Sequence, residues 1–75
     1  MTEKRPFDLL NNALNTSVLV RIKGGVELRG KMVSYDVHMN LVLEEADELA
    51  DGEVKRKLGK VLVRGDNLVF MSPSV

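Results

Sequence analysis

The chain has no cysteine, a single histidine and few aromatic residues, and each shortage excludes a kind of site or structure. Without cysteine there is no disulfide and no thiolate metal site, and one histidine argues against a histidine-based metal cluster. Aromatic residues make up 4% of the 75 residues against 44% hydrophobic residues, so we expect an aliphatic core. One small domain of this size has a marginal core, and we expect association between subunits to reinforce it.

Long hydrophobic segments are missing as well. No apolar run approaches the roughly 20 residues that a membrane-spanning helix needs, so we expect no contact with a membrane. Residues 1–5 lack the apolar core of a signal peptide. These two features predict a cytoplasmic protein.

The charge is balanced in total but not along the chain. The formal net charge is zero, which argues against a general nucleic-acid coat. Residues 44–53 hold six acidic and no basic side chains, whereas residues 55–64 hold five basic and no acidic ones. A solvent-exposed hairpin with ion pairs across its strands explains most of this pattern. Arg64 lies at the far end of the basic stretch and needs another explanation.

Residues 6–14 have the pattern of one short helix. Pro6 suits the first helical position, and the negative charge of Asp8 suits the first turn. Phe7 and Leu10 follow at helical spacing. A helix of this length is not stable alone, so it must dock on the rest of the chain.

The apolar pattern then changes to the period of two that is typical of strands. The expected strands cover residues 18–22, 26–35, 41–43 with a continuation into the acidic stretch, 55–63 and 68–71. Gly24-Gly25 and Asp51-Gly52 mark two of the turns. Gly30 lies on the inward face of the second strand, which indicates a bend or a close packing partner. One short helix and five antiparallel strands predict a mainly β domain with a strongly bent sheet or partly open barrel.

The last two expected strands are apolar on both faces, as Leu62, Val69 and Phe70 show. In a single small domain one of these faces would remain exposed. We therefore expect another subunit to cover it, joined edge to edge with this one.

Two turns carry the candidate binding residues: residues 36–40 and 64–66. His38 and Arg64 offer planar groups that could enclose a flat base, and the amide of Asn40 offers a donor and an acceptor. Stacking planes with an edge-reading amide are the usual means of recognising single-stranded RNA bases.

Three further residues complete this candidate site. Gly65 would let the backbone come close to the ligand, and Asp36 and Asp66 would hold the other groups in place. Asn40 alone could satisfy uracil or cytosine by flipping its amide. If Asp36 accepts a hydrogen bond from the Asn40 amide nitrogen, the flip is blocked and uracil is favoured.

Each of these residues also has a simpler explanation. Taken alone, His38, Asn40 and Asp36 are ordinary turn residues, and Arg64-Gly65-Asp66 is an ordinary hairpin turn. We expect Met39 to be part of the core. We expect Tyr35 to pack within the sheet, although it could stack a second base on an outer face.

These residues, in this order, resemble the Sm and Sm-like (LSm) family of RNA-binding proteins, in particular its archaeal members. The first Sm motif would be residues 18–43, with Gly24-Gly25, Gly30 and Asp36 followed by Met39-Asn40. The second would be residues 59–71, centred on Val63-Arg64-Gly65-Asp66-Asn67. A short variable hairpin, residues 44–57, lies between them. The resemblance covers nearly all of a single domain, residues 1–75, and departs from the family at no motif position.

The resemblance implies a helix on a bent five-stranded sheet and a ring of identical subunits, usually seven. In such a ring the fourth strand of one subunit joins the fifth strand of the next, and uridine-rich single strands bind around the pore. The RNA-binding residues carried over are His38, Asn40, Arg64, Gly65, Asp66 and Asp36. No metal or other cofactor is implied.

The leading functional prediction is therefore an RNA-binding ring that acts as a scaffold or chaperone in RNA processing or turnover. A ring that binds proteins, with incidental RNA binding, is the alternative, and the neutral net charge favours it slightly. An enzyme is the third class. It would need a nucleophile or a metal together with a base, and the single histidine has no serine or cysteine partner in its motif.

Overall fold

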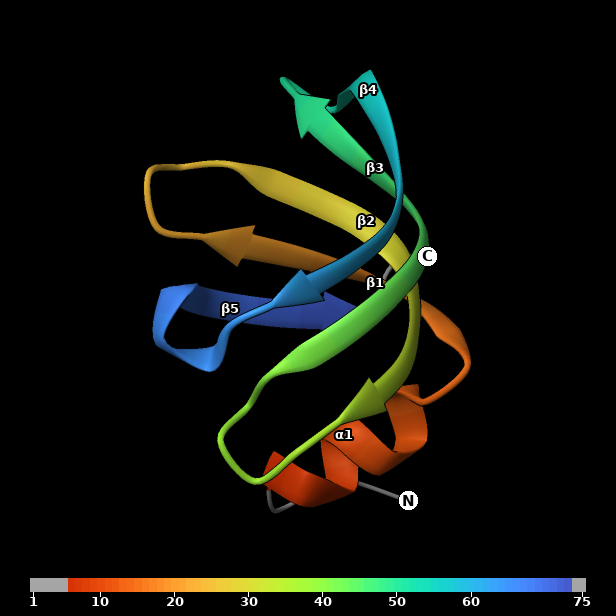
Figure 1. The fold of residues 1–75 in the computed structure, drawn as a ribbon, viewed down its shortest axis with the longest axis vertical. Helices are drawn as coiled ribbons and strands as arrows, with labels where there is room; N and C mark the ends of the chain where they lie inside the picture. Colours follow the sequence, from red (N-terminus) through yellow and green to blue (C-terminus); the bar gives the residue numbers. More distant parts are fainter. Residues whose placement is uncertain (1–5, 74–75) are drawn as a thin grey trace.

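The computed structural model describes residues 6–73 and contains one helix and five strands. Their bounds are α1 (Pro6–Ala13), β1 (Thr16–Ile22), β2 (Glu27–Tyr35), β3 (Leu41–Ala50), β4 (Glu53–Val63) and β5 (Leu68–Pro73). A short 3-10 helix, η1 (Gly65–Asn67), joins the last two strands. The strands form one antiparallel sheet in the order β4-β3-β2-β1-β5 (Figure 1). The predicted fold class is confirmed; the two ends of the predicted domain, residues 1–5 and 74–75, lie outside the described residues.

Helix α1 ends one residue earlier than predicted, and the connection to β1 explains why. Asn15 adopts a left-handed conformation with φ 65°, and its N–H donates to the Met32 carbonyl at 2.6 Å. The Thr16 hydroxyl donates to the Ala13 carbonyl at 2.7 Å, which satisfies one of the last helical acceptors. Leu10 is buried in the core, so the helix docks on the sheet as expected (Figure 1).

The core is aliphatic, as the composition predicts. Ten buried side chains from α1 and strands β1 to β4 form it: Leu10, Ala13, Val18, Val20, Leu28, Met32, Leu41, Leu43, Ala46 and Val63. Met39 packs against this cluster, so its predicted place in the core is confirmed. Tyr35 also packs against it, and its ring stacks on Phe7 of α1 with centroids 6.2 Å apart. Its hydroxyl donates to the Asn11 side chain, which leaves Tyr35 engaged with the helix.

The regular pairing of β2, β3 and β4 is interrupted near Gly30, Ala46 and Gly59. A Cβ atom at Gly30 would lie 3.0 Å from the Ala46 Cα and 3.1 Å from the Glu44 carbonyl oxygen. Gly59, with φ 77°, pairs with Ala46, and Glu45 beside it has φ 53°. These residues interrupt the regular register, and bulges of this kind increase local bending and twist. The close packing partner expected for Gly30 is therefore Ala46.

Strand β3 continues into the acidic stretch as predicted, and β4 begins two residues earlier than predicted, because the acidic and basic stretches pair with each other. β3 continues to Ala50 and β4 begins at Glu53, around a turn at residues 51–52. Glu48 accepts hydrogen bonds from the Arg56 guanidinium at 2.6 and 3.0 Å. The guanidinium hydrogen bonds lower the pKa of Glu48, so its charge persists in mildly acidic solution. The predicted hairpin with ion pairs across its strands is confirmed.

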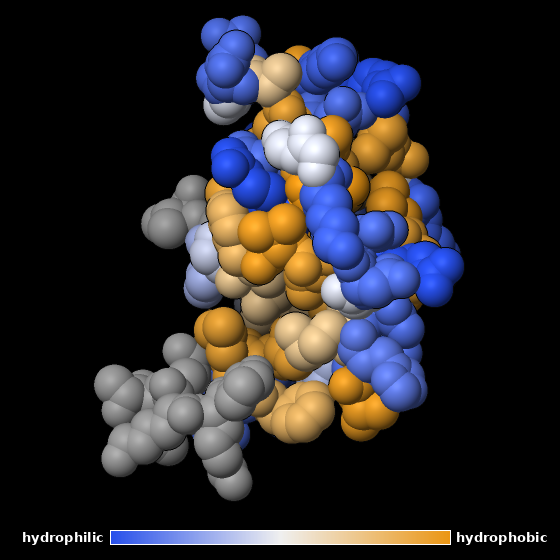
Figure 2. All heavy atoms as spheres, turned by 90° about the vertical axis from the view of Figure 1, so that its left-hand side faces the viewer, coloured by the Kyte–Doolittle hydropathy of each residue, from blue (hydrophilic) through white to orange (hydrophobic). Residues whose placement is uncertain are grey.

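The two outer strands of the sheet carry exposed apolar side chains. Leu62 on β4 is 64% exposed, and Val69 and Phe70 on β5 are 57% and 41% exposed. Figure 2, which faces the left-hand side of Figure 1, shows hydrophobic side chains uncovered across the middle of the molecule. In residues 6–73 no helix is long and apolar enough to cross a membrane.

Candidate nucleic-acid interface

Two turns far apart in the sequence meet on one side of the sheet. One is the turn of residues 36–40 between β2 and β3, and the other is η1 with Arg64 (Figure 1). The backbone N–H of Gly65 donates to the Asn40 Oδ1 at 2.7 Å. A Cβ atom at Gly65 would lie 1.9 Å from the His38 carbonyl oxygen, so this approach requires glycine.

The carboxylate of Asp36 organises the first turn. Its Oδ1 accepts the backbone N–H groups of His38 at 2.8 Å and Asn40 at 3.1 Å. Its Oδ2 accepts the Asn40 side-chain amide at 3.0 Å. The Asn40 hydrogen bonds, together with the nearby His38, hold the pKa of Asp36 below its usual value. The carboxylate is therefore charged at neutral pH. It accepts hydrogen bonds from three N–H donors of the turn and so fixes the conformation of the turn.

The amide of Asn40 is oriented at both ends. The Gly65 N–H can only donate, so it must face the amide oxygen, and the Asp36 carboxylate can only accept, so it must face the amide nitrogen. The predicted contact between Asp36 and Asn40 is confirmed. The contact from Gly65 was not predicted. One amide hydrogen and one oxygen lone pair remain for a ligand.

Five of the six predicted site residues line one open pocket of about 480 Å³: His38, Asn40, Arg64, Gly65 and Asp66. The side chains of His38, Arg64 and Asp66 are exposed, and Asn40 is half-buried beneath them. An Arg64 Nη2 lies 3.5 Å from an Asp66 carboxylate oxygen. Asp36 does not line this pocket, but its carboxylate is hydrogen-bonded to Asn40. The structure thus brings all six residues together.

This arrangement suits a flat ligand with a mixed polar edge. The imidazole and guanidinium provide exposed planes, on which bases stack with little regard to sequence. The oriented amide of Asn40 presents a fixed hydrogen-bonding edge, the kind of group by which proteins distinguish one base from another. Within residues 6–73 no group of three acidic or histidine side chains is placed to hold a metal ion.

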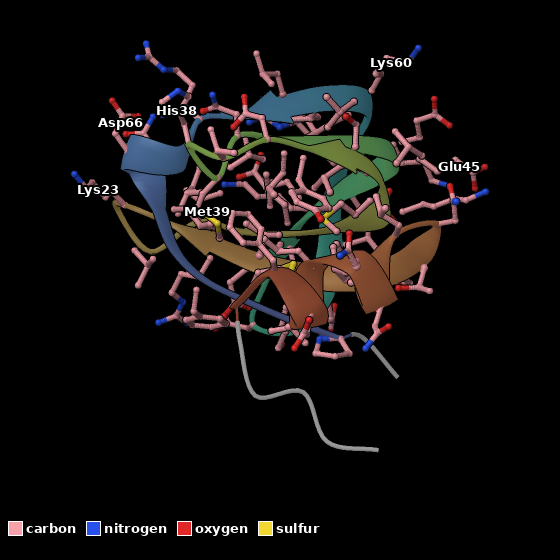
Figure 3. The ribbon with its side chains drawn as sticks, turned by 90° about the horizontal axis from the view of Figure 1, so that it is seen from below. Lys23, His38, Met39, Glu45, Lys60 and Asp66 are labelled. Atoms are coloured by element: carbon pink, nitrogen blue, oxygen red, sulfur yellow. The ribbon has the colours of Figure 1, made fainter. Side chains whose placement is uncertain are left out.

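Lys23 belongs to the same side of the molecule and was not predicted as a site residue. Its backbone N–H donates to the Asn67 carbonyl at 2.8 Å, which joins the β1–β2 turn to η1. Figure 3 shows Lys23 with His38 and Asp66 along one edge, and Lys60 at the other side of the molecule. The available sequence signal was a basic residue directly before Gly24-Gly25, in the turn that follows the first strand.

A helix docked on a strongly bent five-stranded sheet, with a polar pocket where two turns meet, defines the Sm-like class of small β domains. The family model described as the LSM domain matches residues 8–73. The chain belongs to this family. The resemblance noted from the two motifs is therefore confirmed.

Proteins of archaea are among its relatives. A protein of Methanococcoides burtonii, named as an snRNP Sm-like protein, is 65% identical over 69 residues, or 92% of this chain and 96% of that one. The solved Sm protein of Pyrococcus abyssii, in complex with a uridine heptamer, is 44% identical with a TM-score of 0.89. The match covers 95% of this chain and all of that one. A heptameric archaeal Sm protein is 42% identical with a TM-score of 0.82, over 88% of this chain and 96% of that one.

Proposed function

We propose that this chain forms a homo-oligomeric ring of seven subunits that binds uridine-rich single-stranded RNA at its pore. The ring acts in the cytoplasm as a scaffold or chaperone in RNA processing or turnover. Each subunit contributes a single Sm-like domain, in which residues 44–57 form the variable hairpin. The observation that carries the proposal is the Asn40 amide, held at both ends and placed among the exposed planes of His38 and Arg64.

The orientation of Asn40 favours uracil over cytosine. Uracil presents a donor at N3 and an acceptor at O4, whereas cytosine presents an acceptor at N3 and a donor at N4. The Asn40 oxygen accepts the uracil N3–H, and its free amide hydrogen donates to O4. His38 and Arg64 stack on the two faces of the base, while Gly65 and Asp66 close the pocket. These groups bind and do not transform a ligand, so we propose no catalytic role.

Ring formation follows from the unpaired edges of the sheet. β4 and β5 are the outer strands of the order β4-β3-β2-β1-β5, so β4 of one subunit can add to β5 of the next. An apolar pocket of about 300 Å³ opens between α1 and β5, and its lining includes Leu9, Leu10, Met39, Leu68, Val69 and Met71. The exposed Leu62 side chain of the neighbouring β4 suits this pocket. Two of the similar solved proteins support the proposal, one a heptamer and one bound to a uridine heptamer.

Light scattering combined with titration of oligouridine, oligocytidine and oligoadenine tests the proposal. We expect a mass seven times that of the chain and binding of oligouridine in preference to the other two. A ring that binds all three weakly and equally would instead favour the protein-interaction scaffold, the alternative that the zero net charge supports. A stable monomer at micromolar concentration would contradict both functions.

A further inference from the structure

A third turn lies beside the two that form the pocket. It joins β1 to β2, and its conformation is fixed by two backbone hydrogen bonds, from Ile22 to Val26 at 2.9 Å and from Gly25 to Ile22 at 3.2 Å. Because β1 pairs with β5 as well as β2, this turn lies next to the start of β5. The bond from Lys23 N–H to the Asn67 carbonyl then fixes the Lys23 backbone beside η1.

The Lys23 side chain is exposed at the edge of the molecule where His38 and Asp66 also lie (Figure 3). Among residues 6–73, the ion pairs found involve Arg21, Lys55, Arg56, Lys60 and Arg64, and none involves Lys23. Its ammonium group is therefore available to a ligand.

Arg64 is less suited to a second task. Its guanidinium has the Asp66 carboxylate 3.5 Å away, and in the proposed function its plane covers a face of the base. A nucleotide also carries a negatively charged phosphate, and a cation other than Arg64 is needed to neutralise it. Lysine, a mobile point charge with three donors, binds phosphate without demanding one fixed geometry.

We propose that Lys23 binds the backbone phosphate of the nucleotide whose base occupies the pocket, an inference that rests on the proposed function. Base selection and charge neutralisation then belong to different turns: Asn40 reads the base, and Lys23 neutralises the phosphodiester. In a ring, one such ammonium group per subunit lies beside each base pocket. The affinity for oligouridine then depends on salt through these lysines as well as through Arg64.

The test compares Lys23→Gln with Lys31→Gln, a matched change at an exposed lysine midway along β2. Binding of oligouridine is measured by fluorescence anisotropy at several salt concentrations. We expect Lys23→Gln to lower the affinity and to reduce the salt slope by about 0.7 for each phosphate that is no longer neutralised. The ratio of uridine to cytidine affinity remains unchanged, Lys31→Gln behaves as the wild type, and Lys23→Arg restores the slope.

Oligouridine with uncharged methylphosphonate linkages supplies the second arm. The wild type should bind it more weakly than the natural strand, and this difference should be smaller for Lys23→Gln. If Lys23→Gln weakens binding of both strands by the same factor, or Lys31→Gln reduces the slope as much, the assignment of Lys23 is wrong. Wild-type rings that do not bind oligouridine at all would refute the proposed function itself. Wild-type binding that Lys23→Gln leaves unchanged would refute only the role of Lys23.

Discussion

At the scale of single residues, the structure fixes the orientation of the Asn40 amide, and the proposed preference for uracil depends on that orientation. A free amide satisfies uracil or cytosine equally well by turning over, so discrimination requires fixed partners on both sides. Asp36 supplies an acceptor and Gly65 supplies a donor, at 3.0 and 2.7 Å. Against cytosine, the oxygen of this fixed amide would face the acceptor N3, and its N–H would face the donor at N4. Each buried group left unpaired in this way costs about 1–3 kcal/mol.

We predict that Asp36→Ala reduces the preference for uridine over cytidine more than it reduces total affinity. The carboxylate no longer holds the Asn40 nitrogen, and only the Gly65 N–H still opposes the flip. Part of the preference should therefore persist. Competition between oligouridine and oligocytidine on wild-type and variant rings measures this, and an unchanged ratio would contradict the orienting role of Asp36.

The pKa of Asp36 provides a test without RNA. The Asn40 side-chain hydrogen bond is the largest cause of its lowering from the usual 3.8. Because the folded value is depressed, the stabilisation by Asp36 is complete above pH 3.8 and is lost as the pH falls through the lower, folded value. Asn40→Ala should raise the pKa of Asp36, as measured by the pH dependence of its carboxyl carbon resonance. The Glu48 resonance, governed by Arg56, should titrate as in the wild type.

His38 and Arg64 should differ in their response to salt. In the proposed function both contribute a stacking plane, and stacking is worth about 1–3 kcal/mol per base by truncation. His38→Ala and Arg64→Ala should both weaken oligouridine binding. Only the arginine change removes a permanent cation, so only it should also flatten the salt dependence. Equal salt slopes for the two variants would show that the roles are assigned wrongly.

The residue types of the pocket could be predicted from the sequence, but two of its contacts could not. Asp36 and Asn40 lie four residues apart in one turn, so their hydrogen bond could be predicted from the local sequence. The Gly65 bond to Asn40 joins residues 25 apart in the sequence. Lys23 approaches η1 only because β1 pairs with β5, a long-range pairing that no local pattern contains.

At the scale of elements, the long hairpin of β3 and β4 shows tertiary pairing overriding local composition. The predicted third strand covers residues 41–43 and continues into the acidic stretch, which has few of the β-branched and aromatic residues that favour strands. In the structure β3 lies between β2 and β4 and continues to Ala50. Its carboxylates form ion pairs with the basic residues of β4. Lys60 Nζ lies 3.8 Å from the Glu44 Oε2, in addition to the pair of Arg56 with Glu48. The turn at Asp51-Gly52 was visible in the sequence, and the length of the strands on either side depended on these pairs.

The close approach of β2 to β3 depends on the glycine at position 30, which packs against Ala46. A Cβ at Gly30 would meet the Ala46 Cα at 3.0 Å and backbone atoms that have little freedom to move. We predict that Gly30→Ala destabilises the fold by about 1–3 kcal/mol, the usual cost of overpacking a filled core. Thermal unfolding followed by circular dichroism measures it. Ser34→Ala, at an exposed position of the same strand, is the control and should leave the midpoint nearly unchanged; equal midpoints for both variants would show that the sheet can relax at Gly30.

At the scale of the whole molecule, the open sheet and the exposed apolar side chains belong together. A closed barrel would pair β4 with β5 within one chain, but here both strands are outer strands of the sheet. An edge that is long, apolar and unpaired invites addition of another strand. Because the two edges differ, the contact is head to tail, and such contacts form a ring if the rotation between subunits closes.

Leu62 provides the last prediction, because it is an apolar side chain on β4 that is 64% exposed in the single chain. In the ring we expect it to fill the pocket between α1 and β5 of the next subunit, where burial of a leucine contributes about 1.5–3 kcal/mol. Leu62→Lys would replace this contact with a buried charge at every interface of the ring. The mass measured by light scattering should fall from seven chains to one or a few, and oligouridine binding should weaken with it.

Val54→Lys is the matched control, because Val54 is an exposed apolar residue of the same strand beside the turn at residues 51–52. β5 spans six residues and β4 spans eleven, so a neighbouring β5 covers only part of β4. We expect the neighbouring β5 to cover the half of β4 that contains Leu62. Rings of the Val54→Lys variant should therefore keep their mass. Intact Leu62→Lys rings would show that the subunits associate through another surface, and loss of the ring in Val54→Lys alone would place the contact at the far end of β4.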